Sequence, residues 1–184
     1  AYGRRRIHLA ATNGFSGGYT RSENSLSCVA ISGSGNAMER DYDFDSRIYH
    51  SDMRDAADIG RIAAARAVER AGARKPKTGN YPVLFDERIS SSLIGHLVSA
   101  ANGAAIARGA SWLRDALGED ILPKGLSLIE DPHRPRAFSS RMFDAEGLAT
   151  KKRAIIDDGS LTGWTLDLSN ARKLDMESTA SAFR

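Results

Sequence analysis

The chain has 184 residues, enough for one large domain or parts of two, and its 41% hydrophobic and 27% charged residues are typical of a folded, soluble protein. Its 26 basic and 23 acidic residues leave a net charge of only +3, which argues against a nucleic-acid partner. No apolar stretch approaches the roughly 20 residues that span a bilayer, so no membrane association is expected.

Both ends of the chain read as cuts in a longer protein. The first residue, Ala1, is not a methionine, no signal peptide follows it, and nothing before Arg184 marks a structural end. The single cysteine, Cys28, excludes an intrachain disulfide and is expected as a buried thiol in a strand. This cysteine usage fits a reducing compartment, and a cytoplasmic protein is expected.

The first 50 residues have the alternating pattern of β-structure. Asn13-Gly14 marks a turn, Gly17-Gly18 a further break, and residues 33–36 (GSGN) a flexible connection. The expected strands cover residues 6–10, 26–32 and 37–44. Three strands joined by glycine-rich turns predict an antiparallel meander.

A helix is expected next, between an N-cap at Asp52 and a stop at Gly72. Its small apolar side chains recur at steps of three and four residues, which predicts one buried face. This stripe consists of Ala56, Ile59, Ala63 and Ala67. Three charged residues fall off the stripe and are expected to face water: Arg54, Arg61 and Glu69.

The basic stretch 73–80 contains proline and glycine and no large apolar side chain, so it reads as a linker. We therefore expect a domain boundary here, with one domain in residues 1–73 and a second in residues 74–184. The second part mixes helices and strands, and the whole chain is expected to have an α+β fold.

Local signals place the elements of the second part. Asp158-Gly159 lies between two β-rich runs and predicts a hairpin. The expected strands are Pro82–Phe85 (buried), Leu126–Ile129, Arg153–Asp157 and Leu161–Leu166. The expected helices are Glu87–Ala101, a stretch from Ala104 to Leu117 that is broken near Gly109, and a turn at Asn170–Leu174.

Chemistry-bearing motifs are weak in this chain. The four histidines, His8, His50, His96 and His133, are too far apart for a local metal-binding motif. The serine run 90–92 reads as capping and a polar helix face, and no Gly-x-Ser-x-Gly elbow or phosphate-binding loop is present. No catalytic residue is therefore assigned, and composition and motifs alone lead only to a soluble α+β protein.

Several longer segments, read together, resemble the PmbA (TldE) branch of the TldD/PmbA protease family. They occur in the family's order and cover nearly the whole chain. The segments are residues 13–17 (NGFSG), 91–96 (SSLIGH), 131–136 (DPHRPR), 140–147 (SRMFDAEG) and 163–172 (GWTLDLSNAR). The resemblance implies a two-part fold and a heteromeric protease, of which residues 1–73 would be the end of the N-terminal α/β domain and residues 74–184 the start of a truncated C-terminal domain.

The resemblance also implies a degenerate metal motif. In the TldD branch a helix carries His-Glu-x-x-x-His, which supplies two metal ligands and a catalytic glutamate. Here Ser91 and Ser92 stand at the first two positions, and only His96 remains. A catalytic zinc needs three protein ligands and a base for its bound water, and a serine hydroxyl is poor in either role. We expect no metal in this chain and zinc in a TldD-type partner.

Three functions stay open at this point. The first is a non-catalytic subunit of a cytosolic metalloprotease that processes peptides and unfolded segments together with a TldD-type chain. Such a subunit completes a substrate channel or holds an extended peptide by strand addition. The second is a regulatory or binding module without a protease role, as in the family's older label of DNA gyrase modulator. The third is an active peptidase with another constellation, for which no base and nucleophile pair is found.

Overall fold

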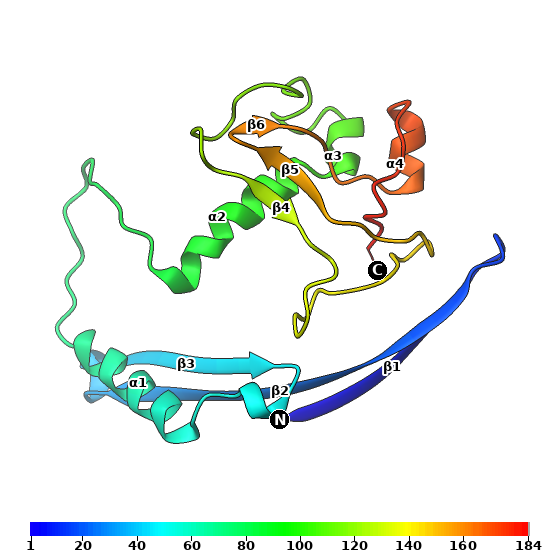
Figure 1. Ribbon diagram of the computed structural model, residues 1–184. Helices are drawn as coiled ribbons and strands as arrows, with labels where there is room; N and C mark the ends of the chain where they lie inside the picture. The colour runs from blue at the N-terminus through cyan, green and yellow to red at the C-terminus, as the bar shows by residue number, and fades with distance from the viewer. Residues whose placement is uncertain (184) are drawn as a thin grey trace. The chain divides into compact units, whose positions relative to one another are not determined.

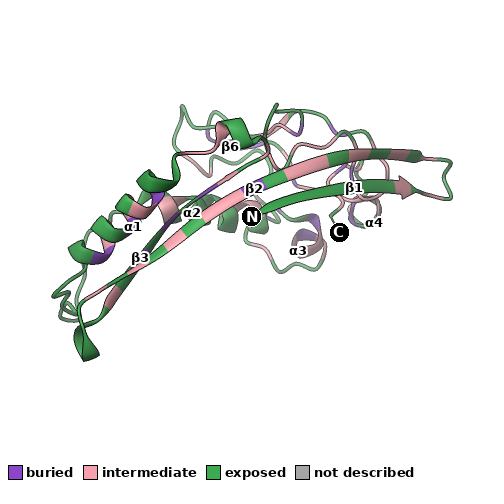
Figure 2. Ribbon diagram, turned by 90° about the horizontal axis from the view of Figure 1, so that it is seen from below, coloured by how far each residue is buried: buried purple, intermediate pink, exposed green. Residues whose placement is uncertain are grey.

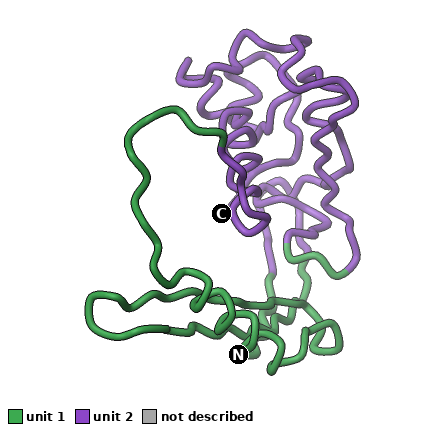
Figure 3. Tube along the Cα trace, turned by 90° about the vertical axis from the view of Figure 1, so that its left-hand side faces the viewer, with its two compact units in different colours: residues 1–7, 18–82, 136–138 green, residues 8–17, 83–135, 139–184 purple. Residues whose placement is uncertain are grey.

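The computed structural model of the protein describes residues 1–183, which form an α+β fold of antiparallel strands and helices, as expected (Figure 1). The chain divides into two compact units, and each is described by itself (Figure 3). Unit 1 comprises residues 1–7, 18–82 and 136–138, and unit 2 comprises residues 8–17, 83–135 and 139–184. Within residues 1–183, no helix combines the length and the apolar character that crossing a membrane requires.

Unit 1 is built on a three-stranded sheet with the order β1-β2-β3. The strands are β1 (Tyr2–Ala10), β2 (Ser16–Ser32) and β3 (Glu39–Arg47). The turn at Asn13-Gly14 is confirmed, because the Phe15 N–H donates to Asn13 Oδ1 at 3.0 Å and Gly14 has a φ of 89°. The break predicted at Gly17-Gly18 is wrong: β2 runs through both residues. The ring of Phe15 lies where a Cβ on Gly17 would be, so glycine suits the strand there.

The sheet of unit 1 differs from prediction at its other turn as well. β3 begins at Glu39 rather than Ala37, because a short 3₁₀ turn, η1 (Gly35–Ala37), precedes it. Gly33 has a φ of 80°, and a Cβ there would lie 2.4 Å from the Ala37 carbonyl oxygen, so this turn depends on glycine. At the far side of the sheet, β1 is exposed along almost all its length (Figure 2).

Helix α1 (Ala56–Glu69) packs on β3. Its N-cap is Asp55, whose Oδ1 accepts a hydrogen bond from the Ala57 N–H at 2.8 Å. The prediction of Asp52 as the cap is wrong, since Asp52 belongs to a separate 3₁₀ turn, η2 (His50–Asp52). The predicted stripe is confirmed: the buried residues of the helix are Ile59, Ala63 and Ala67.

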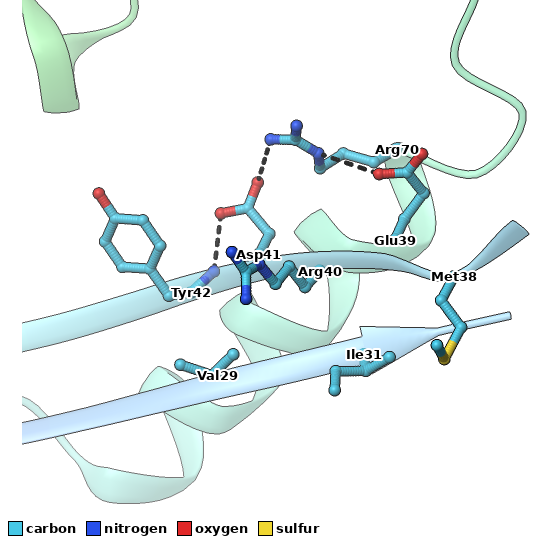
Figure 4. Close-up of a pocket in the computed structure, with 8 residues that line it drawn as sticks. All are labelled: Val29, Ile31, Met38, Glu39, Arg40, Asp41, Tyr42 and Arg70. Atoms are coloured by element: carbon cyan, nitrogen blue, oxygen red, sulfur yellow. Dashed lines mark hydrogen bonds and ion pairs between the residues drawn. The ribbon is translucent and has the colours of Figure 1, made fainter. Parts of the chain in front are cut away.

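The face of the sheet under α1 is acidic. Asp41, Asp43 and Asp45 alternate along β3 and are all buried. Arginines neutralise these aspartates. Arg54, before α1, and Arg66, on α1, each lie 2.8 Å from Asp43. Arg70, at the C-cap of α1, lies 3.3 Å from Asp41 and 3.7 Å from Glu39 (Figure 4). Asp45 pairs with Arg47 of β3 at 3.0 Å. The prediction that Arg54 only faces water is therefore wrong.

Cys28 on β2 lies opposite Asp43 of β3 in the strand register and is half-buried. The prediction of a buried thiol is therefore wrong too.

These ion pairs make the stability of unit 1 dependent on pH. Burial raises the pKa of the Asp43 carboxyl, but the hydrogen bonds and charges of Arg54 and Arg66 outweigh it and hold the pKa below the ordinary 3.8. A carboxylate with a depressed pKa stabilises the fold above its unfolded pKa, and this stabilisation is lost as the pH falls through the folded-state pKa. Urea unfolding followed by far-UV circular dichroism should show constant stability from pH 7 to pH 5 and a loss below about pH 4.

The control for this pH titration is Asp43→Asn, which removes one of the titrating groups. Its stability should fall less steeply with acid than that of the unchanged protein, because fewer protons are taken up on unfolding in this pH range. Parallel curves for the two proteins would contradict the assignment of this pH dependence to Asp43.

Unit 2 combines helices with a small sheet of the order β4-β5-β6. The elements are α2 (Glu87–Ala100), α3 (Gly103–Ala107), β4 (Leu128–Glu130), β5 (Arg153–Asp157), β6 (Ser160–Leu161) and α4 (Leu168–Lys173). The hairpin at Asp158-Gly159 is confirmed, and both residues have a positive φ, 44° and 89°. Its second strand, β6, is shorter than predicted, since residues beyond Leu161 leave the sheet.

The core of unit 2 gathers residues that lie far apart in the sequence. The largest buried side chains are Ile106, Leu113, Ile156, Leu161 and Leu166. Trp164 packs with them, and its indole Nε1–H donates to the Leu113 carbonyl at 3.2 Å. This bond satisfies the one polar atom of the buried indole ring. It also connects the loop after α3, which carries Leu113, to the segment after β6, which carries Trp164.

Two predicted elements of unit 2 are wrong. The segment Pro82–Phe85 forms no strand and is exposed, with Leu84 98% accessible, because no strand among the described residues lies beside it to pair with it. The helical stretch from Ala104 is confirmed as far as Ala107, and the break predicted near Gly109 is confirmed as well, since Gly109 has a φ of 70°. The helix predicted from there to Leu117 is wrong, because turns follow.

Candidate functional site

Helix α2 carries the three residues at the degenerate metal-motif positions. The helix starts at the N-cap Asp86, whose Oδ1 accepts from the Arg88 N–H at 2.9 Å. Ser91, Ser92 and His96 are all exposed on it. The Ser92 hydroxyl donates to the Ile89 carbonyl of its own helix at 2.6 Å, which is a local bond that leaves it poorly placed as a ligand.

The three side chains do not form a ligand set. Ser91 and His96 keep the i, i+5 spacing of the two histidines in the His-Glu-x-x-x-His motif, so what these positions lack is donor chemistry, because a serine hydroxyl is a poor zinc ligand. Among residues 1–183, no group of three or more histidine, cysteine or acidic side chains is arranged to hold a metal ion. The donor chemistry of these positions therefore does not fit a zinc site, and the absence of a metal in this chain stays a prediction.

A pocket of about 500 Å³ lies where the C-terminal end of α2 meets the small sheet. Val98 and Ser99 reach it from α2, the whole of β4 lines it, and Ile155 reaches it from β5. Its wall surface is mostly apolar, although nine of its fifteen lining residues are polar or charged. This combination is typical of sites that bind an apolar group in a fixed orientation.

A half-buried ion-pair cluster borders this pocket. Glu130, at the end of β4, accepts from Arg141 Nη2 at 3.1 Å and from Arg153 Nε at 2.9 Å. Arg153 Nη1 also donates to the Trp164 carbonyl at 3.0 Å. Glu130 stands next to Asp131 in the sequence, and neighbouring acidic residues are common in turns. In the structure, however, Glu130 is the last residue of β4, and its carboxylate connects Arg141 to Arg153. Sequence reasoning missed this role because both arginines are distant from Glu130 in the chain.

The segment 140–147 is held in place by Asp144, which is buried. Its Oδ1 accepts from the Glu146 and Leu148 N–H groups, both at 2.9 Å, and its Oδ2 accepts from the Ala182 N–H at 3.1 Å. One carboxylate thus satisfies three backbone donors from two segments. This explains why an aspartate is needed at this point of the loop.

The tip of the β1–β2 hairpin packs against this same loop within unit 2. The rings of Phe15 and Phe143 lie 4.8 Å apart. Gly147 has a φ of 81°, and a Cβ on it would lie 2.6 Å from Phe15 Cγ. The two segments NGFSG and SRMFDAEG, far apart in the chain, therefore meet, and Phe15 and Gly147 are complementary. No local signal in the sequence could have predicted this contact.

Comparison with known families adds to this geometry. Residues 78–184 match the model of the PmbA/TldA metallopeptidase C-terminal domain, and residues 1–71 match that of the PmbA/TldA metallopeptidase central domain. The chain belongs to the PmbA/TldD family. The resemblance inferred from the sequence segments is thus confirmed.

Individual relatives show how much of the PmbA/TldD proteins the chain represents. The metalloprotease PmbA of Escherichia coli O157:H7 is 38% identical over 171 residues, which are 93% of this chain and 38% of that protein. A PmbA homolog of Haemophilus influenzae is 33% identical over 89% of this chain and 36% of its own length. The chain therefore spans well under half the length of these curated relatives.

Solved structures of the family share the fold. A putative modulator of DNA gyrase from Bacteroides thetaiotaomicron is 33% identical and matches with a TM-score of 0.90 over 99% of this chain and 42% of its own. TldE from Thermococcus kodakarensis matches with a TM-score of 0.79 at 21% identity, over 100% of this chain and 41% of its own, a likeness of fold alone. The α+β architecture described above is thus the fold of PmbA/TldD proteins.

Proposed function

We propose that this chain acts within a non-catalytic subunit of a cytoplasmic TldD/TldE-type metalloprotease that trims or degrades peptides and unfolded segments. One observation carries the proposal: Ser91 and Ser92 stand where the family's metal-binding helix has histidine and glutamate. A single imidazole, that of His96, is too few ligands for a catalytic zinc, and a serine hydroxyl at neutral pH cannot serve as the base.

In this proposal the catalytic zinc and the intact His-Glu-x-x-x-His helix belong to a TldD-type partner chain. This chain supplies a surface that receives the peptide, and the pocket beside α2 and β4 supports that role because apolar surface and hydrogen-bonding groups line it together. We further propose that the boundary between the two domains lies in the linker, with residues 1–73 on one side and 74–184 on the other.

The test is metal content and peptidase activity of the protein, alone and mixed with a TldD-type partner. We expect no bound zinc and no cleavage of an unfolded reporter peptide by the protein alone, and cleavage by the mixture. A partner whose motif glutamate is replaced by glutamine is the control and should leave the mixture inactive. Stoichiometric zinc and peptide cleavage by this protein alone would overturn the proposal.

The alternative is a regulatory or binding module without a protease role. What supports it is the description of the Bacteroides relative as a putative modulator of DNA gyrase. The small net charge of +3 gives it little electrostatic support. Binding to DNA that weakens steeply with salt, together with an inactive mixture, would favour this alternative over the first.

A further inference from the structure

The stretch that joins α1 to α2 is exposed at every residue from 71 to 86 and contains no helix or strand. Its tyrosine bonds locally, since the Tyr81 hydroxyl donates to the Lys77 carbonyl at 2.8 Å. The central-domain model of the family ends at residue 71 and the C-terminal-domain model begins at residue 78. Residues 72–77 therefore lie between two domains of the family and belong to neither, as expected of an interdomain linker.

The basic residues of this linker offer bonds to a trypsin-like protease, which cuts after lysine or arginine. Exposed segments without secondary structure are the preferred sites of nicking, because they enter the groove of a protease without any unfolding. The bonds after Arg74 and Lys77 meet this requirement, whereas the bond after Lys75 is protected because proline follows it. Hydrolysis after Lys77 adds one water across the peptide bond and leaves a carboxylate on Lys77 and an amino group on Thr78.

The two units are not simply the two sides of this linker. Residues 8–17, at the tip of the β1–β2 hairpin, precede the linker but belong to unit 2 (Figure 3). Phe15 at this tip is half-buried, and its ring lies 4.8 Å from that of Phe143 and fills the space that a Cβ on Gly147 would need. Phe143 and Gly147 follow the linker, so a cut in the linker leaves these contacts in place.

A second segment crosses in the opposite sense. Residues 136–138 follow the linker but belong to unit 1. Arg136 forms an ion pair with Asp52, and its guanidinium lies 4.6 Å from the ring centroid of Tyr49. Each piece of a chain that is cut in the linker therefore contributes a segment to the unit that the other piece mostly forms.

We propose that the linker is a nicking site for trypsin-like proteases and that the nicked chain stays assembled, held by the hairpin tip in unit 2 and by Arg136 in unit 1. Once the chain has folded, the covalent linker is then dispensable for keeping the two pieces together. The inference does not depend on the proposed function, because neither a metal nor a TldD-type partner takes part in it.

The experiment treats the folded protein with a low concentration of trypsin and identifies the first cuts by mass spectrometry. We expect the first cuts after Arg74 and Lys77, and we expect the two pieces to co-elute in size-exclusion chromatography at the volume of the uncut protein. A denaturing gel of the same fraction should show both pieces. A first cut elsewhere would overturn the nicking site, and pieces that separate without denaturant would overturn the contacts that hold them.

Matched variants test the nicking site. The double change Arg74→Gln and Lys77→Gln should abolish the first cuts, whereas Arg108→Gln, at an exposed arginine outside the linker, should leave them unchanged. Cleavage of the double variant as fast as that of the unchanged protein would contradict the assignment of the linker.

Phe15→Ala tests the hairpin tip. In the nicked protein this change should weaken the association of the two pieces at least about tenfold, measured by sedimentation over a dilution series, because the aromatic contact and its buried apolar surface are lost. Phe15→Leu keeps much of the apolar volume and should weaken it less. Phe44→Ala is the control, since Phe44 lies on β3 in unit 1 and is 54% exposed.

The uncut variants are compared first, and each should keep the far-UV circular dichroism of the unchanged chain. The linker holds the hairpin tip near its contacts in an uncut chain, so the loss should appear only after nicking. Association in nicked Phe15→Ala as tight as in the nicked unchanged protein would overturn the role of the hairpin tip.

Discussion

Replacing Ile156 by alanine is expected to lower the free energy of unfolding of unit 2 by about 2–5 kcal/mol, the range for large-to-small changes in a protein core. Ile156 is fully buried on β5 and faces Leu161 and Leu128 across the two neighbouring strands. The change leaves a cavity that the surrounding strands cannot fill. Both tryptophans, Trp112 and Trp164, belong to unit 2, so urea unfolding followed by tryptophan fluorescence reports on this unit.

The control for this change is Ile129→Ala, in the neighbouring strand β4. Ile129 is 53% exposed, so its truncation removes less buried apolar surface and should cost under about 1 kcal/mol. Equal losses in the two variants would show that the packing around Ile156 does not hold unit 2 together.

Asp43→Asn is expected to destabilise unit 1 by about 3 kcal/mol, the low end for breaking a buried ion pair. The carboxylate is buried, and Arg54 and Arg66 each approach it to 2.8 Å. The same Arg54 nitrogen also donates to the Phe44 carbonyl at 2.6 Å, which fixes the guanidinium beside the carboxylate. Both arginines are partly exposed, which lowers the cost of leaving them unpaired.

Asp58→Asn is the matched control for Asp43→Asn. Asp58 pairs with Arg61 at 2.7 Å on the exposed side of α1, and both side chains are more than half accessible. An exposed pair contributes at most about 1 kcal/mol, so this variant should unfold almost as the unchanged protein does in urea, as followed by far-UV circular dichroism. A loss as large as that of Asp43→Asn would mean that the burial of the acidic face is irrelevant to stability.

The elements that were predicted well are those with a local cause. The stripe of α1 follows from periodicity, and the β5–β6 hairpin follows from Asp158-Gly159, whose two residues adopt the positive φ that such a turn requires. Pro82–Phe85 failed because an apolar run becomes a strand only where another strand pairs with it, and periodicity does not report neighbours.

The candidate site was predictable only in part. Ser91, Ser92 and His96 could be placed on a helix from the sequence, and their interpretation as a degenerate metal motif stays a prediction. The pocket could not be predicted, because it joins the end of α2 to β4 and to the loop that carries Arg134. Likewise, the partners of Glu130 lie 11 and 23 residues away in the sequence, beyond the reach of any local pattern.

The acidic face beneath α1 has a consequence for the thermodynamics of unit 1. Exposure of apolar surface raises the heat capacity on unfolding, whereas exposure of polar surface lowers it. The interface between α1 and β3 buries aspartates and alanines, with Ile59 as its one fully buried large aliphatic side chain among the described residues, so its opening hydrates much polar and little apolar surface. The heat-capacity change of unit 1 should therefore be small for its size. Its stability curve is then broad and shallow, and cooling weakens unit 1 less than it weakens the aliphatic core of unit 2.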